Sequence, residues 1–215
     1  MKRLLTLLLL TALLSAVTDS KAQRRGKSHA SSFDYEIRGG INFSQIDGDG
    51  SGNYNKIGFH VGAGTSMPLS GDARWRLCVE VGLSQKGAHI VNDVFNRRIS
   101  LLYVEVPLML AYDFLDSRNL RVSAGLAPAI LAAARVTDDK ALNNSHSNNY
   151  KLIDALPLTA GVRYRITDHI GVDLRYCNSM LNIAKENGSG TYRISRANKG
   201  QFNRLIQAGI TISFN

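Results

Sequence analysis

Apolar and polar residues alternate along most of the chain with a period of two, the pattern of β-strands that have one apolar and one polar face. A strand that crosses a bilayer obliquely takes about 9–11 residues, and each alternating segment is close to that length. The sequence therefore predicts eight strands that can span a membrane. These segments are 35–43, 57–64, 75–84, 102–113, 120–127, 156–165, 170–177 and 206–214.

The connections between the predicted strands alternate in length. Three are short, at 69–74, 114–119 and 167–169. The others are longer, which is typical of outer-membrane β-barrels with tight periplasmic turns and long outer loops, whereas a soluble sandwich has no reason to sort its loops in this way. The long connections are 45–55, 85–98, 136–153 and 178–201.

The polar face of the strands carries charges of both signs in mid-strand. In a closed eight-stranded barrel this face points inward, where side chains roughly fill the interior and buried charges persist only when they are paired. With five arginines and four acids, the set is nearly balanced, so we expect an ion-pair network in the lumen. Its members are Glu36, Arg38, Arg76, Glu80, Glu105, Arg121, Arg163, Asp173 and Arg175.

Aromatic residues gather near the strand ends on the apolar face, as the aromatic girdles of membrane barrels do. Together with the alternation, they predict an all-β fold, an eight-stranded antiparallel transmembrane β-barrel of the outer-membrane type. The aromatic positions are Tyr35, Phe43, Phe59, Trp75, Tyr112, Tyr164, Tyr176 and Phe214.

Composition fits this fold once the two faces are averaged. The mean hydropathy of −0.10 argues against a bundle of transmembrane helices, but it suits strands that are apolar on one face only. Two cysteines exclude a disulfide-rich scaffold. The net charge of +9 invites a nucleic-acid partner, a possibility that the first residues of the chain then exclude.

The first 22 residues have the features of a secretory signal. Lys2 and Arg3 precede an apolar run over 4–17, and small residues then allow cleavage before Gln23. An anchor helix is the alternative, but a span needs about 20 apolar residues. We expect a signal peptide at 1–22, a flexible basic tail at 23–33 and an outer-membrane barrel domain at 34–215. An exported protein rarely meets nucleic acid, so the basic excess points elsewhere.

Three stretches carry a family resemblance. They are GGINFS at 39–44, VEVGLSQKGA at 79–88 and LYVEVPLML at 102–110. In these the chain resembles the outer-membrane β-barrel family of Bacteroidetes often called PorT-like, over about 34–214. The resemblance implies an integral outer-membrane barrel of eight strands. Because PorT itself is associated with type IX secretion, it also implies a link to protein secretion.

No motif for catalysis, metal binding or a cofactor stands out. The stretch from Asp47 resembles the first half of a calcium loop, but its twelfth position is Gly58 rather than a bidentate glutamate. The histidines show no metal-ligand spacing, and there is no nucleophile elbow. We expect no enzyme activity and no cofactor, and we expect Cys78 and Cys177 to be free thiols.

The last long connection is the one concentrated basic region of the predicted loops. It is expected either to bind lipopolysaccharide phosphates or an acidic partner, or to be a solvated loop. This basic outer loop comprises Lys185, Arg193, Arg196, Lys199 and Arg204.

These features together favour a non-enzymatic integral outer-membrane barrel that serves as a structural or accessory subunit of a surface or secretion assembly. Its expected partners are outer-membrane lipid and lipopolysaccharide, with other envelope or secretion proteins. A narrow pore or small-solute channel is the alternative, although an interior crowded with Arg and Glu leaves little room for solute. A soluble lipocalin-like barrel would need an apolar lumen instead.

Overall fold

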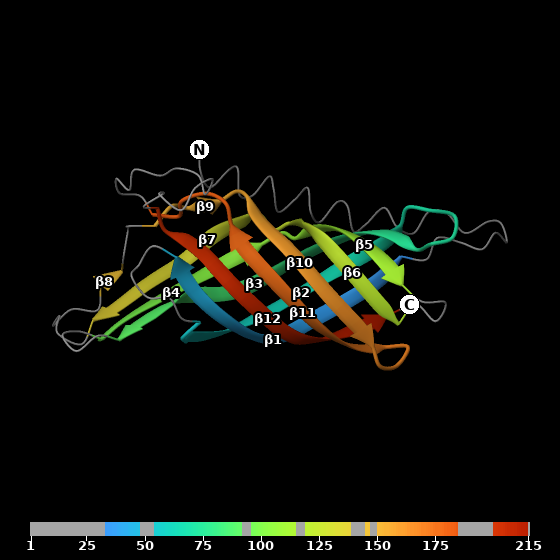
Figure 1. The fold of residues 1–215 in the computed structure, drawn as a ribbon, viewed down its shortest axis with the longest axis horizontal. Coiled ribbons are helices and arrows are strands. Elements are labelled where there is room, and N and C mark those ends of the chain that lie inside the picture. The colour runs from blue at the N-terminus through green and yellow to red at the C-terminus, as the bar shows by residue number, and fades with distance from the viewer. Residues whose placement is uncertain are drawn as a thin grey trace. The chain divides into compact units, whose positions relative to one another are not determined.

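The computed structural model describes residues 33–47, 54–91, 96–114, 119–138, 145–146, 150–184 and 200–214. Within these ranges no part of the chain forms a helix with the length and hydrophobicity to cross a membrane. The described residues form one antiparallel sheet (Figure 1). Its strands are β1 (Asp34–Asp47), β2 (Lys56–Pro68), β3 (Trp75–Val91), β4 (Asn96–Glu105), β5 (Leu108–Phe114), β6 (Leu120–Leu126), β7 (Ala129–Asp138), β8 (Ser145–His146), β9 (Ile153–Asp154), β10 (Pro157–Arg165), β11 (Ile170–Ser179) and β12 (Phe202–Phe214).

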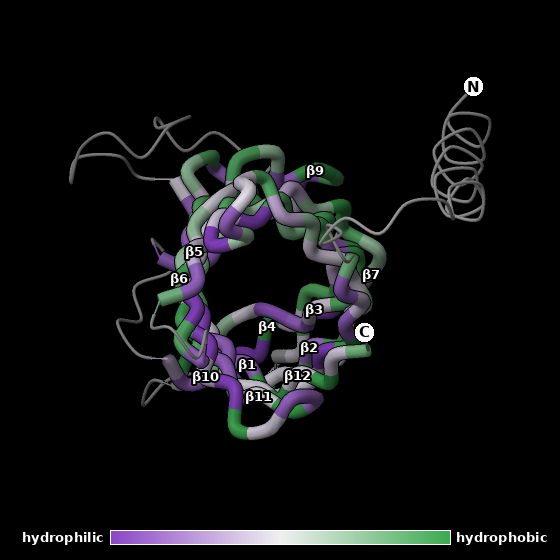
Figure 2. The backbone as a smooth tube through the Cα atoms, turned by 90° about the vertical axis from the view of Figure 1, so that its right-hand side faces the viewer, coloured by the Kyte–Doolittle hydropathy of each residue, from purple (hydrophilic) through white to green (hydrophobic). Residues whose placement is uncertain are grey.

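The sheet closes on itself. It runs β2-β1-β12-β11-β10-β6-β5-β3, and β2 also pairs with β3, so the two ends of the path meet. Three wall strands are interrupted, since β4 continues as β5, β6 continues as β7, and β8 and β9, which both pair with β7, continue as β10. Counted in this way the wall has eight strands, which Figure 2 shows as a ring. The prediction of an eight-stranded antiparallel barrel is confirmed.

A proline marks each of the three splits, and the three prolines follow one another on neighbouring wall strands. Proline has no backbone N–H to give to a ladder, so a strand breaks or bends where it occurs. The wall nevertheless stays bonded, because Val106 N donates to Pro128 O at 2.9 Å and Ala127 N donates to Pro157 O at 2.9 Å. Glu80 N donates to Pro107 O at 3.0 Å in the same way. Pro107, Pro128 and Pro157 are called the proline row below.

The two faces of the wall are the reverse of those of a soluble protein. Along β2 the buried residues include His60 and Lys56, whereas Phe59 and Ile57 are exposed. The same alternation runs through β11, where Asp173 and Arg175 are buried and Leu174 has an exposed fraction of 56%. An apolar outer surface over a polar interior is the arrangement that a lipid environment requires.

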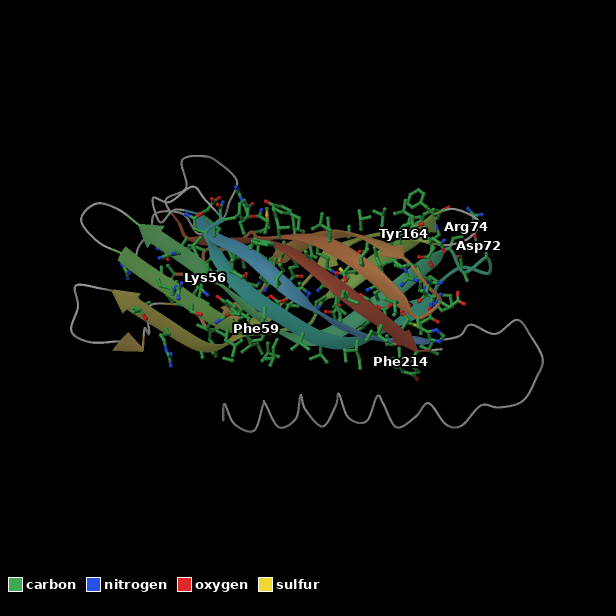
Figure 3. The ribbon with its side chains drawn as sticks, turned by 90° about the horizontal axis from the view of Figure 1, so that it is seen from below. Lys56, Phe59, Asp72, Arg74, Tyr164 and Phe214 are labelled. Atoms are coloured by element: carbon green, nitrogen blue, oxygen red, sulfur yellow. The ribbon has the colours of Figure 1, made fainter. Side chains whose placement is uncertain are left out.

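The short connections lie at one end of the barrel, together with both ends of the wall. Tyr35 pairs with Phe214, so the first and last strands meet there. This is called the short-turn end, and the opposite one the long-loop end. Exposed aromatic side chains gather at the short-turn end, where the half-buried Tyr112 lies edge-on to the exposed Trp75 at a centroid distance of 4.9 Å. Figure 3 shows Tyr164 and Phe214 on the outside of the wall at the same end.

One short turn holds a small polar cluster outside the bilayer. Ser70 Oγ and Arg74 N donate hydrogen bonds to Asp72, and these lower the pKa of that exposed carboxyl. The turn runs from the end of β2 at Pro68 to the start of β3 at Trp75, as the sequence predicts.

The strands at the long-loop end reach further than predicted. The prediction that 85–98 is a long loop is wrong, because β3 runs to Val91 and β4 begins at Asn96. The polarity of the two faces reverses in this region. Ala88 and Ile90 are buried inside, and His89 lies on the outer face. Here the apolar residues point inward and the polar ones outward, and Gly87 interrupts the pattern. A search for strands with an apolar outer face therefore does not find this segment.

Candidate functional site

The barrel interior at the short-turn half is crossed by ion pairs. Arg38 of β1 donates from Nε to Asp173 Oδ1 of β11 at 2.5 Å and from Nη1 to Gln207 Oε1 of β12 at 3.2 Å. Asp173 also accepts a hydrogen bond from Thr211 Oγ1 at 2.9 Å. Asp173 therefore joins three neighbouring strands through side chains alone.

Arg175 and Arg38 together neutralise Glu80. Arg175 Nη1 lies 2.8 Å from Glu80 Oε2, and Arg38 Nη1 lies 3.8 Å from Glu80 Oε1. Glu105, which faces the same interior from β4, has a different cation, since Lys86 Nζ lies 2.5 Å from Glu105 Oε1. The two inward glutamates of adjacent strands are thus each matched by their own positive charges.

A second cluster lies on β6, β10 and β1. Arg121 donates from Nε to Asp113 Oδ1 at 2.6 Å and from Nη2 to Asp113 Oδ2 at 3.0 Å, a bidentate pair. Arg121 also donates from Nη1 to Glu36 Oε1 at 3.2 Å. Arg163 Nη1 lies 2.7 Å from Glu36 Oε2, so Glu36 connects two arginines to the first strand.

The ninth predicted residue, Arg76, lies nearer the short-turn end. Its Nη2 is 2.7 Å from Asp34 Oδ2, and its Nε donates to Ser66 Oγ at 3.0 Å. The structure thus places all nine predicted charges on the inner face and brings each of them to an opposite charge.

Three partners in this network were not among the predicted residues. Asp113 has the same strand parity as Glu105, so the alternation alone identifies it. Asp34 lies one residue before the first predicted strand. Lys86 lies in the region read as a loop, and extending the alternation of β3 past Ser84 brings it to the inner face. For Asp34 and Lys86 the missing signal was the extent of a strand rather than the type of residue.

The middle of the lumen is a polar layer around Lys86, which is fully buried. Its Nζ lies 5.1 Å from the ring centroid of Tyr103, within range of a cation–π contact. Tyr103 Oη accepts a hydrogen bond from Asn203 Nδ2 at 3.3 Å. Nearby, Ser179 Oγ donates to the buried Asp154. The residues of this layer come from five wall strands.

Apolar side chains form a buried cluster in the lumen at the long-loop half, beside buried polar residues such as Ser44 and Asn203. The apolar side chains come from inward positions of β1, β3, β4 and β7 and from the segments that continue the wall around 150 and 183. Such packing is the arrangement of an ordinary protein core and excludes water. This group, called the outer apolar cluster, comprises Ile46, Ala88, Ile90, Ile99, Leu101, Tyr103, Ala129, Tyr150 and Ile183.

A cavity of about 470 Å³, a volume that includes adjoining solvent, lies among the ion pairs. Glu36, Arg38, Glu80 and Arg163 line it, together with the thiol of Cys78. Cys78 and Cys177 are both free cysteines. Nowhere in the described ranges do three or more His, Cys, Asp or Glu side chains gather as metal ligands would.

Most of the basic outer loop lies outside the described residues. This applies to Lys185, Arg193, Arg196 and Lys199, and it applies equally to the predicted signal peptide at 1–22 and nearly all of the tail at 23–33. Arg204 is described. It belongs to β12, and its Nη2 lies 2.9 Å from Asp47 Oδ2 on β1.

A closed barrel with an apolar outer surface, a salt-bridged interior and short turns at one end defines an integral membrane β-barrel of the outer-membrane class. The family model described as "Outer membrane protein beta-barrel domain" matches residues 21–185, and the chain belongs to that family. It is therefore a protein of the outer membrane of Gram-negative bacteria, in contact with its lipid.

The chain is similar to several solved structures. The attachment invasion locus protein Ail of Yersinia pestis superposes with a TM-score of 0.51 at 11% identity, over 85% of this chain and 99% of that one. Neisserial surface protein A gives 0.46 at 15% identity, over 86% and 100%. OprG of Pseudomonas aeruginosa gives 0.39 at 13%, over 86% and 97%. At such identities the likeness concerns the fold alone. No curated protein is detectably similar in sequence.

Proposed function

We propose that this protein is a sealed, non-enzymatic barrel that serves as a structural or accessory subunit of a surface or secretion assembly. The observation that carries the proposal is the filling of the lumen in two layers, the ion pairs of one half and the outer apolar cluster of the other. A barrel filled in this way supports contacts made by its outer surface and loops rather than transport through its interior.

The two layers oppose the passage of a solute for different reasons. An ion that enters the outer apolar cluster loses its hydration without gaining a polar partner, at a cost of many kcal/mol. A polar solute in the other half must separate pairs such as Arg121 with Asp113, and breaking a buried pair costs about 3–5 kcal/mol. The cavity near Glu36 lies among these ion pairs, so a solute that entered it would still meet the salt-bridged side chains that line it.

The first test is conductance. The refolded protein, inserted into planar bilayers at 1 M salt, is expected to give no discrete current steps, because neither layer offers a continuous hydrated path. Folding is verified beforehand by the heat-dependent shift in gel migration of intact barrels. Reproducible steps from preparations that pass this check would establish the alternative, a narrow pore or small-solute channel.

The finer identity rests on sequence. We assign the chain to the PorT-like barrels of Bacteroidetes and to a type IX-like secretion or surface assembly on the strength of the motifs at 39–44, 79–88 and 102–110. A signal peptide cleaved before Gln23 belongs to the same proposal, as do the tail at 23–33 and the barrel domain at 34–215. The basic residues of the last loop, with Lys185 and Arg193 among them, would contact acidic groups of lipopolysaccharide or of an envelope protein.

The second test concerns partners. A photo-crosslinking residue at Arg193 or Arg196 is expected to capture a defined envelope protein in native membranes, because the proposal assigns the contact to this loop. The matched control places the same probe at Leu174, whose exposed side chain faces the lipid, and it should capture no protein. A subunit role would be contradicted by a monomer with no crosslinked protein at either loop position.

A further inference from the structure

Two arginines lie side by side on the outer face of the wall near the long-loop end. Arg98 of β4 pairs in register with Thr137 of β7, and Arg135 of β7 pairs with Ser100 of β4. Arg98 and Arg135 are therefore diagonal neighbours on one face of the sheet, a separation that long side chains bridge easily. Both are exposed.

These arginines lie just beyond the band of apolar residues on the outer surface of the wall, toward the long-loop end. On the wall strand formed by β4 and β5, the outward residues from Phe114 to Leu102 are apolar or aromatic, and Ser100 and Arg98 follow. At about 3.3 Å per residue and a tilt near 40°, this stretch is roughly 30 Å tall, close to the thickness of the hydrocarbon region. On the neighbouring wall strand, Ile130 and Ala133 precede Arg135. The two guanidinium groups therefore lie at the level of lipid phosphates.

Their surroundings favour an anion. Within the described ranges neither Arg98 nor Arg135 forms an ion pair, in contrast to the inward arginines, and two like charges on adjacent strands repel. Ser100 lies between them and accepts a hydrogen bond from Gln85 Nε2 at 2.9 Å, which leaves its hydroxyl hydrogen to be donated. Two guanidinium forks and a hydroxyl suit the oxygens of a phosphate.

We infer that Arg98 and Arg135 bind the phosphate of a phosphorylated glycolipid in the outer leaflet. The inference rests on the proposed function and on the orientation expected from the sequence, with the short turns in the periplasm and the long loops outside the cell. It adds a lipid contact on the wall of the barrel to the contacts proposed for the last loop. The site is formed by β-strand register, so it is present before the lipid arrives.

The test measures lipid binding to the full mature chain in detergent by native mass spectrometry, with bisphosphorylated lipid A as the probe. The R98Q/R135Q variant should bind about thirtyfold more weakly, since a basic side chain near an anionic surface contributes roughly a fivefold factor. The R98K/R135K variant keeps the charge and should lose only a part of the affinity, because lysine lacks the planar fork. Raising the salt concentration should weaken binding by the wild-type protein.

Arg74→Gln provides the matched control. It removes an exposed arginine at the short-turn end, far along the wall from the proposed site, and should leave lipid A binding unchanged. Lipid A without phosphates should bind the wild-type protein no better than it binds R98Q/R135Q. The inference would be overturned if R98Q/R135Q bound lipid A with wild-type affinity, or if Arg74→Gln lost as much affinity as R98Q/R135Q. It would also be overturned if the wild-type protein bound the dephosphorylated lipid as tightly as lipid A. None of these results bears on conductance, so the proposal of a sealed lumen is tested independently.

Discussion

Replacing Gly40 with valine is expected to prevent assembly of the barrel. Gly40 of β1 faces the interior opposite Gly209 of β12, and the ring of His60 lies against both. A Cβ at Gly40 would come within 2.1 Å of Ala208 O and 2.8 Å of His60 Cε1. The first contact is with backbone of the adjacent strand, which cannot move without breaking the ladder. We expect a loss above about 4 kcal/mol and no heat-modifiable species after refolding.

The neighbouring residue supplies the control. A Cβ at Gly39, on the outer face, would be no closer than 3.8 Å to any neighbour, the nearest being His60 O. Gly39→Val should therefore refold with the wild-type yield and extend the apolar outer surface. Equal refolding of Gly40→Val and Gly39→Val, or equal failure, would show that the Gly40–Gly209 contact does not limit assembly.

Replacing Arg121 with methionine is expected to lower the free energy of unfolding by about 3–5 kcal/mol. The change leaves Asp113, which is 1% exposed, without its bidentate partner and removes one of the two arginines on Glu36. An uncompensated buried charge is the costly result of such a change. Urea titration of the protein in lipid vesicles measures the effect, followed by the fluorescence of Trp75, the single tryptophan.

Two further variants distinguish the effect of breaking the buried ion pair on the free energy of unfolding from the effect of losing an arginine side chain. Arg121→Met combined with Asp113→Leu removes both charges and should recover most of the stability, since apolar replacement of a buried pair is often near neutral. Arg74→Gln breaks a partly exposed pair with Asp72 across 3.9 Å and should cost no more than about 0.5 kcal/mol. If Arg121→Met behaved like Arg74→Gln, water in the lumen would be screening the network.

The wall of the barrel could be predicted from sequence because lipid imposes a strict rule. Outward positions such as Val162 and Ile210 must be apolar, inward positions follow by parity, and an error of a single residue moves a side chain to the wrong face. The rule ends where the wall leaves the lipid. Beyond Lys86 the inward residues Ala88 and Ile90 are apolar and the outward His89 is polar, so a search for apolar outward positions does not find this part of β3.

The pairing within the lumen could not be predicted in the same way. Parity places Glu36 and Arg121 on the inner face, but their contact joins β1 to β6, which are not adjacent in the sheet. Such contacts depend on the tilt and stagger of the closed wall. Lys86 combines both difficulties. It lies in β3 beyond the predicted strand, and its partner Glu105 lies on another strand.

The proline row has a mechanical consequence. Pro107, Pro128 and Pro157 lie on neighbouring wall strands and each withholds a ladder donor, so we expect the sheet to bend more easily along this row. A load applied to the outer extensions of β3, β4 and β7, such as the pull of a tethered surface partner, is taken up by bending along that row. The ion-paired half below keeps its register. We therefore expect the half of the barrel that holds the ion pairs to stay rigid while the strands at the long-loop end bend.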